Sequence, residues 1–497
     1  MVSVASSPPL PSQRQPDALR LVDRRWYEHL LRAIGFGIPV IALGLASASL
    51  GLLSNQHAHI LDKAFLAHDT GRLESIGFLY PPLPFLLAVI LPSPWALAVI
   101  GGLAAGATAW LLWYGLQRTT LDPITRSLLL AGVIATPSLL FLASQQISDM
   151  LQLHLFLVSW FYYLNFIRLR HTWSGFTAGL VLGLAFFAGF SALIAALALA
   201  FLTPLFSPPE DQRVEARVAQ ALVILFPALW AAFSWGYTSW TFTGRWLDYL
   251  TDPTAPVTLP HSLAELSVRA WDVTQQMVHE LPHAPLFLGI FLLVLRYQPR
   301  GAIGLGTLIP VIWLIRVLGF PFGTALTIAT LTVIAVAGIS RRISRRWGPV
   351  LVALVALQIL VNTLVSPPAT ELRAWIQALI HWQQPPAAQA ERQFALSLVD
   401  AMPSHHILAD DRSAYRLVAQ AGTAQPFLLP ADQGFEQALA QPCGRVHVVL
   451  VSRMPVPGDR VSARYAITPP PGFTLRTTWG EWLVYAHDPA MPCPSTS

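Results

Sequence analysis

Long apolar runs alternate with short polar segments over most of the chain between residues 33 and 365. Because a helix needs about 20 apolar residues to cross a bilayer, these runs predict about eleven transmembrane helices. They lie near residues 33–53, 95–116, 127–145, 149–167, 175–188, 190–206, 218–238, 284–297, 302–319, 322–339 and 348–365. The apolar segment 81–91 is too short to cross and is followed by Pro92 and Pro94, so we predict a helix that lies on the membrane surface or re-enters it.

The arginines between the runs set the predicted orientation. With the amino terminus inside the cell, most of them fall on the cytoplasmic side, as the positive-inside rule requires. They are Arg24, Arg25, Arg118, Arg126, Arg168, Arg170, Arg213, Arg217, Arg296, Arg300, Arg341, Arg342, Arg345 and Arg346. This orientation predicts an integral protein of the cell (inner) membrane with a flexible cytoplasmic tail over residues 1–23. Loops 54–94 and 239–283, and the chain after about Ser366, then lie on the outer side.

A composition change after Pro367-Pro368 predicts a separate outer domain. We expect a transmembrane domain over residues 24–366, a linker over 367–387, a small α/β domain over 388–490 and a tail over 491–497. In the small domain, helices are predicted near 388–402 and 412–421, the second capped by Asp410-Asp411, with strands over 405–409, 446–451, 473–478 and 482–485. Cys443 and Cys493 both lie there. A disulfide suits an oxidising outer compartment, and two unpaired thiols are the alternative.

Composition supports a polytopic α-helical membrane protein and excludes several other classes. Hydrophobic residues make up 54% of the chain and charged residues 11%, with a net charge of +5. The positive charge fits loops that face anionic lipid, and no basic-aromatic pattern indicates a nucleic-acid partner. The sequence contains no phosphate-binding loop, serine-hydrolase elbow or zinc-protease helix. A transporter remains an alternative, although no convincing internal repeat is present.

Polar residues gather in the first outer loop and at the mouth of one span. His57, His59, Asp62, Lys63, His68, Asp69 and Arg72 precede Tyr80-Pro81-Pro82-Leu83. Asp149 stands at the outer end of an apolar run, where a carboxylate is costly unless it is hydrated, paired or used. Asp149 is therefore a functional candidate, with an ordinary interfacial helix cap as the alternative.

Four features of the chain resemble the GT-C superfamily of membrane glycosyltransferases, in particular the bacterial branch similar to protein O-mannosyltransferases and aminoarabinose transferases. They are the long first outer loop ending in Tyr80-Pro81-Pro82-Leu83, the Ser148-Asp149-Met150-Leu151 segment, the outer-loop stretch from Trp240 to Tyr249, and the small outer domain. They cover most of the chain in the order that the family shows.

The resemblance implies transfer of a sugar from a polyprenyl phosphate-type lipid to an acceptor hydroxyl on the outer face of the membrane. This chemistry requires a base, a clamp for the departing phosphate and an apolar groove for the prenyl chain. The family's loop aspartate falls at His57, so the sequence departs from the pattern at the expected base. Three alternatives stay open: a base from His57 or Asp62, a base from Asp149 or Asp69, and no catalysis in this loop. An imidazole can accept a proton near neutral pH.

The remaining candidates concern the donor, the acceptor and a metal. Arg316, inside a span, is the first candidate for the phosphate clamp; it requires a partner there or must extend to the headgroups. Arg72 and Arg245 are alternatives. Tyr80, Trp246 and Tyr249 are candidates for substrate binding, although aromatic residues also mark membrane interfaces. No cofactor is expected; His57, His59 and Asp62 form a weak candidate set for a divalent metal.

We therefore predict a GT-C-like membrane glycosyltransferase whose partners are a polyprenyl-linked sugar donor, membrane lipid and an acceptor that the sequence does not identify. The alternatives are a non-catalytic protein of the same fold that binds a lipid-linked sugar or a partner protein, and a transporter. The enzyme requires its polar candidates to converge at one outer-facing pocket.

Overall fold

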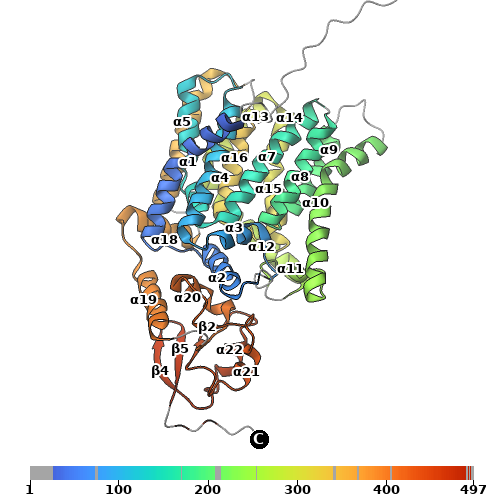
Figure 1. Cartoon of the computed structure of the whole chain (residues 1–497). Helices are drawn as coiled ribbons and strands as arrows, with labels where there is room; N and C mark the ends of the chain where they lie inside the picture. The colour runs from blue at the N-terminus through green and yellow to red at the C-terminus, as the bar shows by residue number, and fades with distance from the viewer. Residues whose placement is uncertain are drawn as a thin grey trace, which may run out of the picture.

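A helical body carries a small sheet domain at one end in the computed structural model (Figure 1). The structure describes residues 26–72, 77–169, 171–206, 214–252, 255–339, 343–365, 369–402, 406–488, Met491 and Cys493. The predicted tail over 1–23, together with Arg24, Arg25, Arg170, Arg213, Arg341 and Arg342, lies outside the described residues, as does the side chain of Arg300.

The helical body extends from α1 to α18. Its α-helices are α1 (Trp26–Ser49), α2 (Asn55–Thr70), α3 (Pro82–Ile90), α4 (Pro94–Leu116), α5 (Pro123–Ile134), α6 (Pro137–Gln145), α7 (Ile147–Leu169), α8 (Thr172–Ala188), α9 (Ala192–Phe206), α10 (Val214–Thr243), α11 (Asp248–Thr251), α12 (Leu263–Glu280), α13 (Pro285–Tyr297), α14 (Pro299–Gly306), α15 (Leu308–Val317), α16 (Thr324–Ala337), α17 (Gly348–Leu364) and α18 (Thr370–His381).

Every apolar run predicted from the sequence overlaps one or two of these helices, but fewer of them are long enough to cross a membrane. Among the described residues, five helices are long and apolar enough, or up to seven if each of two bent pairs is one span. The others, such as α8 and α16, are shorter. A helix rises about 1.5 Å per residue, so 14 to 17 residues do not traverse a hydrocarbon core of about 30 Å without help from flanking segments. The predicted number of eleven spans is therefore not reproduced by helix length.

Proline produces the two bent pairs. The run 127–145, predicted as one span, is divided into α5 and α6, which meet at 53° next to Pro137. The second pair, residues 263–283 and α13, meets at 87° next to Pro285. Proline lacks an amide hydrogen and disfavours helical geometry in the residue before it, so each helix restarts at the proline. The segment 81–91 forms the nine-residue helix α3, which is too short to cross, as expected.

Glycines allow α1 and α4 to pack backbone against backbone. A Cβ added at Gly106 would lie 2.2 Å from the carbonyl oxygen of Ala33 and 2.6 Å from the amide nitrogen of Gly37. One added at Gly102 would lie 2.5 Å from the side chain of Ile41. Close approach through small residues is a general way for membrane helices to associate. This contact fixes α1, and with it the start of α2, against the rest of the body.

The sheet domain contains α19 (Pro386–Ala401), α20 (Asp411–Ala421), α21 (Phe435–Ala440) and α22 (Arg460–Tyr465), with strands β1 (Ile407–Leu408), β2 (Phe427–Leu428), β3 (Val448–Ser452), β4 (Phe473–Trp479) and β5 (Trp482–His487). The strand order is β2-β1-β3-β5-β4; β1 is parallel to β2 and β3, and β5 is antiparallel to β3 and β4. Asp410 caps α20 as predicted, since its side chain accepts a hydrogen bond from the amide of Arg412.

The sequence missed parts of this region. The segment 367–387, predicted as a linker, contains α18, whose residues Leu372, Trp375 and Ile376 are buried against the body. The short β2, α21 and α22 were also missed, because two- to six-residue elements leave too little periodicity to detect.

The segment 54–94 forms the connection between the two parts. Its helix α2 lies between the helical body and α20 of the sheet domain (Figure 1). Nine of its residues are buried, and seven of these are apolar. Its polar side chains need hydrogen-bond or charged partners when they are buried, and these partners come from both parts.

The α1–α4 contact gives a direct test of the fold. Gly106→Val should lower the stability of the detergent-solubilised protein by about 1–3 kcal/mol or more, because the added atoms collide with the backbone of α1. The measurement is the thermal unfolding midpoint, monitored by size-exclusion chromatography. Gly35→Ala is the matched control, since an added Cβ there meets no atom within 4 Å. An unchanged midpoint for Gly106→Val would contradict the packing.

Candidate functional site

His57 lies in the interior at the contact between α2 and α7. Its side chain is 2% exposed, and its Nε2 atom accepts a hydrogen bond from the amide of Ile147, with 3.2 Å between the nitrogens. Burial lowers the pKa of the imidazole to about 3. Because the ring nitrogen that would accept a proton already accepts this bond, the placement favours a role in holding the start of α7.

Asp149 lies next to the same end of α2. The side chain of Gln56 accepts a hydrogen bond from the amide of Ser148 at 3.1 Å. It forms a second hydrogen bond with the Asp149 carboxyl group. Gln145, the last residue of α6, accepts a hydrogen bond from the amide of Ser54 at 2.9 Å. The structure thus brings His57 and Asp149 to one junction, within a network that also positions α2.

Asp62 and Lys63 face the sheet domain. Asp62 is fully buried, and neither of its carboxyl oxygens has a hydrogen-bond partner. Burial raises the pKa of Asp62 well above its usual value, against the opposing charge of Lys63. Lys63 forms a short ion pair with Asp411 at the start of α20. Burial alone would raise the pKa of Asp411, but the charge and hydrogen bond of Lys63 hold it below its usual value.

A cavity of about 350 Å³ opens beside this ion pair, between α2, the segment before α3 and the sheet domain. The His59 ring stacks on Tyr415 with 3.5 Å between the ring centroids and lies 5.7 Å from the Tyr80 ring. Burial, followed by the charge of Lys63, lowers the pKa of His59 to about 4. The cavity is lined by His59, Lys63, Gly77, Leu79, Tyr80, Asp411, Arg412, Tyr415, Pro430, Ala431 and Val456.

Asp69 and Arg72 lie at the other end of α2. Asp69 accepts hydrogen bonds from the amide of Ala424 at 2.8 Å and from the hydroxyl of Thr423 at 3.2 Å, which attaches α2 to the sheet domain. Arg72 is exposed and shares with Asp69 the lining of a separate cavity of about 370 Å³. Neither residue lines the cavity that contains Lys63 and Asp411.

Arg316 meets an acidic partner, as a buried guanidinium requires. It donates to Glu280 at 2.6 Å and to Gln276 at 2.7 Å, both on α12, and Thr324 donates to the second oxygen of Glu280 at 2.6 Å. Glu280 is 2% exposed. The pair joins α12, α15 and α16, and Arg316 is not brought into contact with the polar residues of α2.

The candidate residues that follow α10 do not line the cavity beside Lys63. Arg245 is exposed, and Trp246 stacks on Trp240 with 5.6 Å between centroids on the surface of α10. Tyr249 is buried, with its ring 4.5 Å from that of Phe190. Tyr80 is therefore the one predicted substrate-binding residue of the three that lines the cavity beside Lys63.

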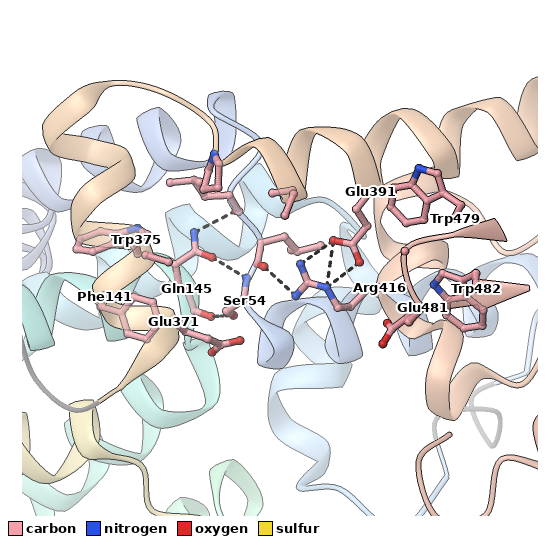
Figure 2. A pocket seen from close by; sticks show the side chains of 17 residues that line it. Ser54, Phe141, Gln145, Glu371, Trp375, Glu391, Arg416, Trp479, Glu481 and Trp482 are labelled. Atoms are coloured by element: carbon pink, nitrogen blue, oxygen red, sulfur yellow. Dashed lines mark hydrogen bonds and ion pairs between the residues drawn. The ribbon is translucent and has the colours of Figure 1, made fainter. Parts of the chain in front are cut away.

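A second and larger cavity, of about 460 Å³, is lined by Arg416 of α20 together with Ser54, Gln145 and Trp375 of the helical body (Figure 2). Arg416 forms an ion pair with Glu391 at 2.8 Å and donates to the side-chain oxygen of Asn55 at 2.8 Å. Tyr415, which lines the first cavity, donates to the same oxygen at 3.1 Å. Asn55 at the start of α2 thus lies between the two cavities and contacts the linings of both.

Sequence reasoning missed the contribution of the sheet domain to this site. Asp411 was interpreted only as part of a helix cap, and Arg412, Tyr415 and Arg416 were not singled out. Two adjacent aspartates at a helix start were the available signal, but pairing with a lysine some 350 positions away leaves no trace in one sequence.

The structure does not bring together His57, His59 and Asp62, the candidate metal ligands. In the described part of the chain, the three donors that converge are Cys443, His487 and Cys493, and not His57, His59 and Asp62. Successive helical positions rotate by about 100°, so His57 points to α7 while His59 points to α20. Cys443 and Cys493 form a disulfide with Cα atoms 5.6 Å apart, which decides between the two alternatives left open by the sequence.

The buried Lys63–Asp411 pair makes a prediction about domain attachment. Lys63→Met should lower stability by about 3–5 kcal/mol, because it leaves the Asp411 carboxylate buried without a partner. The control is Glu436→Gln, which breaks the exposed Arg460–Glu436 pair and should cost about 0–1 kcal/mol. Thermal midpoints and the protease sensitivity of the sheet domain measure both effects. Equal effects of the two substitutions would contradict the assignment.

The buried imidazole of His57 predicts acid sensitivity. Its pKa is about 6.5 when unfolded and about 3 when folded, so the unfolded state takes up a proton as pH falls between these values. Stability is fully present above about pH 6.5 and is lost toward pH 3, with a slope of up to about 1.4 kcal/mol per pH unit. His57→Gln, which keeps an acceptor, should flatten the pH profile of the unfolding midpoint. His68→Gln, an exposed histidine on the same helix, should leave the profile unchanged.

Of the comparisons with known proteins, the one with solved structures finds matches. No protein-family model matches the chain, and no curated protein sequence matches it. Two solved structures of ArnT, an aminoarabinose transferase of the GT-C superfamily, from Cupriavidus metallidurans do match. The structure bound to undecaprenyl phosphate has a TM-score of 0.54 and 13% identity, over 93% of this chain and 100% of that chain. The apo structure has a TM-score of 0.56 and 13% identity, over 91% and 98%. The chain therefore has the ArnT-like fold that its sequence motifs predicted.

Proposed function

We propose that the protein transfers a sugar from a polyprenyl phosphate-type donor to an acceptor hydroxyl, in the cavity between α2 and α20. The observation that carries the proposal is the convergence of Lys63, Arg412, Asp411 and three aromatic rings in one cavity of about 350 Å³. The ArnT-like fold supports the class of donor, since a protein of this fold has been solved with undecaprenyl phosphate. The distribution of arginines along the chain supports an orientation in the cell membrane that places this cavity on the outer side.

The two cations of the cavity suit a phosphate group. Lys63 extends from α2, and Arg412 extends from the first turn of α20. A lysine ammonium and an arginine guanidinium bind phosphate oxygens through charge-assisted hydrogen bonds. Arg412 also donates to the carbonyl of Gly458 at 3.2 Å, which restricts its position.

The rings of His59, Tyr80 and Tyr415 suit a sugar. They line one cavity and offer apolar faces together with hydroxyl and imidazole groups. This is the usual composition of a small-molecule site, with a few polar groups placed on a mainly apolar lining. Tyr80 keeps the substrate-binding role that the sequence predicted.

Asp411 is the proposed base. The acceptor oxygen would attack the anomeric carbon, the bond from that carbon to the phosphate oxygen would break, and the phosphate would leave with the electron pair. The acceptor proton would pass to the Asp411 carboxylate, which Lys63 keeps ionised. Departure of the phosphate towards Lys63 would shift that cation away from Asp411 and make the carboxylate a stronger base.

The cavity lies beside the apolar part of the protein. Phe78, in the segment that leads to Tyr80, packs its ring 5.3 Å from Trp235 and 5.5 Å from Phe242, both on the long apolar helix α10. A prenyl chain could follow this surface while its phosphate enters the cavity. Arg316, Arg72 and Arg245 lie outside the cavity lining, so the proposal assigns the phosphate to Lys63 and Arg412 instead.

A non-catalytic lipid-binding protein of the same fold is the second candidate. It is favoured by one observation: His57, which occupies the position of the family's loop aspartate, is committed to a backbone hydrogen bond. In that case the same cavity would bind a lipid-linked sugar without cleaving it.

Purified protein in detergent with a radiolabelled polyprenyl-phosphate sugar tests the proposal through release of polyprenyl phosphate. Asp411→Asn should lower turnover by about 100-fold or more, in the range typical of a lost general base. Asp122→Asn is the matched control, because this carboxylate caps α5 in the helical body and does not line the cavity. Rates are compared below the unfolding temperature of both variants.

Two outcomes would overturn the assignment. Saturable binding of the lipid without turnover by the unaltered protein would establish the non-catalytic candidate. Loss of turnover in His57→Gln or Asp149→Asn, with full activity in Asp411→Asn, would instead identify the base as one of the candidates predicted from the sequence.

A further inference from the structure

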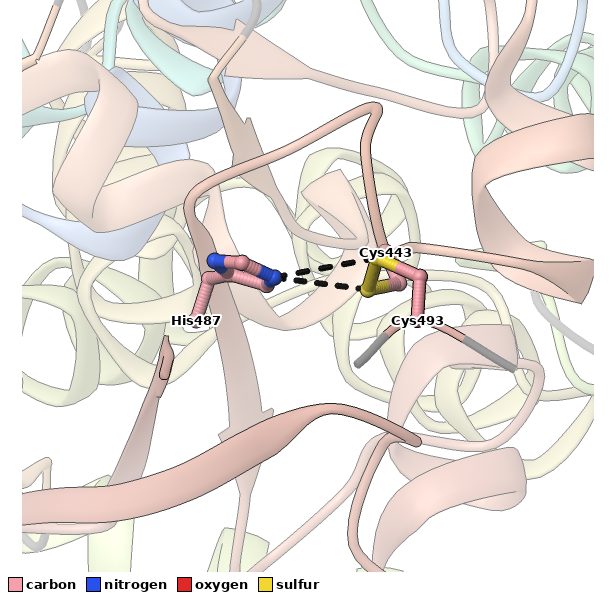
Figure 3. Close-up of a disulfide and its surroundings, with 3 residues drawn as sticks. All are labelled: Cys443, His487 and Cys493. Carbon is pink, nitrogen blue, oxygen red and sulfur yellow. Dashed lines mark hydrogen bonds between the residues drawn. A yellow bond between two sulfur atoms is a disulfide. The ribbon is translucent and has the colours of Figure 1, made fainter. Parts of the chain in front are cut away.

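The disulfide of the sheet domain has a histidine directed at both of its sulfur atoms (Figure 3). The Nε2 atom of His487 lies 3.3 Å from the sulfur of Cys443 and 3.8 Å from that of Cys493. Within the described residues, this is the one group of three His, Cys or acidic donors whose ligand atoms all lie within 4.8 Å of one another. None of the three residues lines the cavities beside α20.

The spacing of these donors matches that of a tetrahedral metal site. With zinc–sulfur bonds of about 2.3 Å and zinc–nitrogen bonds of about 2.0–2.1 Å, a nitrogen and a sulfur ligand stand about 3.5 Å apart. The two nitrogen–sulfur distances are already close to this value. Only the two sulfur atoms would have to separate, to about 3.8 Å, after their bond is broken.

Of the two sulfur atoms, only that of Cys493 has room to move when the pair separates. His487 ends β5, where its amide donates to the carbonyl of His447 at 2.9 Å and its ring meets the edge of Phe473. Cys443 is 6% exposed and packs in the core of the domain. Cys493 is exposed and follows the last strand. Two ligands are thus held by the fold, whereas the exposed side chain of Cys493 has room to move away from Cys443.

We propose that the disulfide and a Cys443–His487–Cys493 metal site are two alternative states of the same three residues, the second binding one Zn²⁺ or a similar soft divalent ion. An external dithiol would supply the two electrons and two protons that convert the disulfide into two thiols, and would itself become a disulfide. Zn²⁺ would then displace both thiol protons to solvent and take neutral His487 as its third ligand. Three protein ligands leave one position for water or another small ligand.

Metal binding to the whole protein tests this inference, and the result does not depend on the proposed transferase activity. The detergent-solubilised chain is reduced with a phosphine, freed of reductant without oxygen and titrated with Co²⁺, then with Zn²⁺. The reduced protein should bind one ion per chain and show a thiolate-to-cobalt charge-transfer band that Zn²⁺ removes. The oxidised protein should bind no ion at this site.

Variants separate the ligands from their neighbours. His487→Ala should weaken binding by more than the roughly 10–100-fold that changes around a metal ligand cause. His447→Ala removes an exposed histidine that immediately precedes β3 and should leave affinity and stoichiometry unchanged. Circular dichroism of the reduced protein and of the Cys443→Ala/Cys493→Ala variant establishes that the domain remains folded without the disulfide.

The inference is overturned if folded, reduced protein binds no stoichiometric Co²⁺, if the charge-transfer band is absent, or if His487→Ala binds as tightly as the unaltered chain. Unfolding of the domain on reduction would also overturn it, because the two states would then not share one fold.

Discussion

The ion pair between Lys63 and Asp411 is the interaction on which the arrangement of the candidate site depends. It is largely buried and joins α2 to a domain that begins more than 300 residues later. Losing one partner of a buried ion pair is costly, because the other charge is left in an environment that solvates it poorly. The ion pair therefore holds the sheet domain against α2. It also places the residues of α20 that line the cavities.

The polar residues of α2 divide between attachment to the two parts of the protein and the lining of a cavity. Ser54, His57 and Gln56 hold the helical body, and Asp69 holds the sheet domain. His59 and Lys63 remain at the cavity. A short polar helix can thus both connect two parts of a protein and supply functional groups, provided that its side chains point in different directions. The same division explains why several residues with reactive side chains are committed to structural bonds.

Some other ion pairs of the molecule are at least partly buried. Arg316 and Glu280 pair where α12 meets α15, and Arg416 pairs with Glu391 beside the second cavity. Asp62 differs, because its buried oxygens have no hydrogen-bond partner. Its raised pKa is the expected response, since protonation removes the charge that burial disfavours. Elsewhere in the sheet domain, Cys443 and Cys493 are joined by a covalent bond and not by an ion pair.

The sequence by itself determined the local features of this protein. Apolar runs located the helices, the short segment before Pro92 gave α3, and Asp410 was identified as a cap, because hydropathy, length and capping act between residues close in the chain. The Tyr80-Pro81-Pro82-Leu83 and Ser148-Asp149 motifs pointed to the ArnT-like fold in the same way. Tertiary structure decided where the apolar runs bend, that residues 370–381 form a helix, and that Cys443 bonds to Cys493. It also decided that His57 turns inward to α7 while Lys63 meets Asp411. These outcomes depend on contacts between residues distant in sequence, and burial against a distant partner fixes the chemistry available to a side chain.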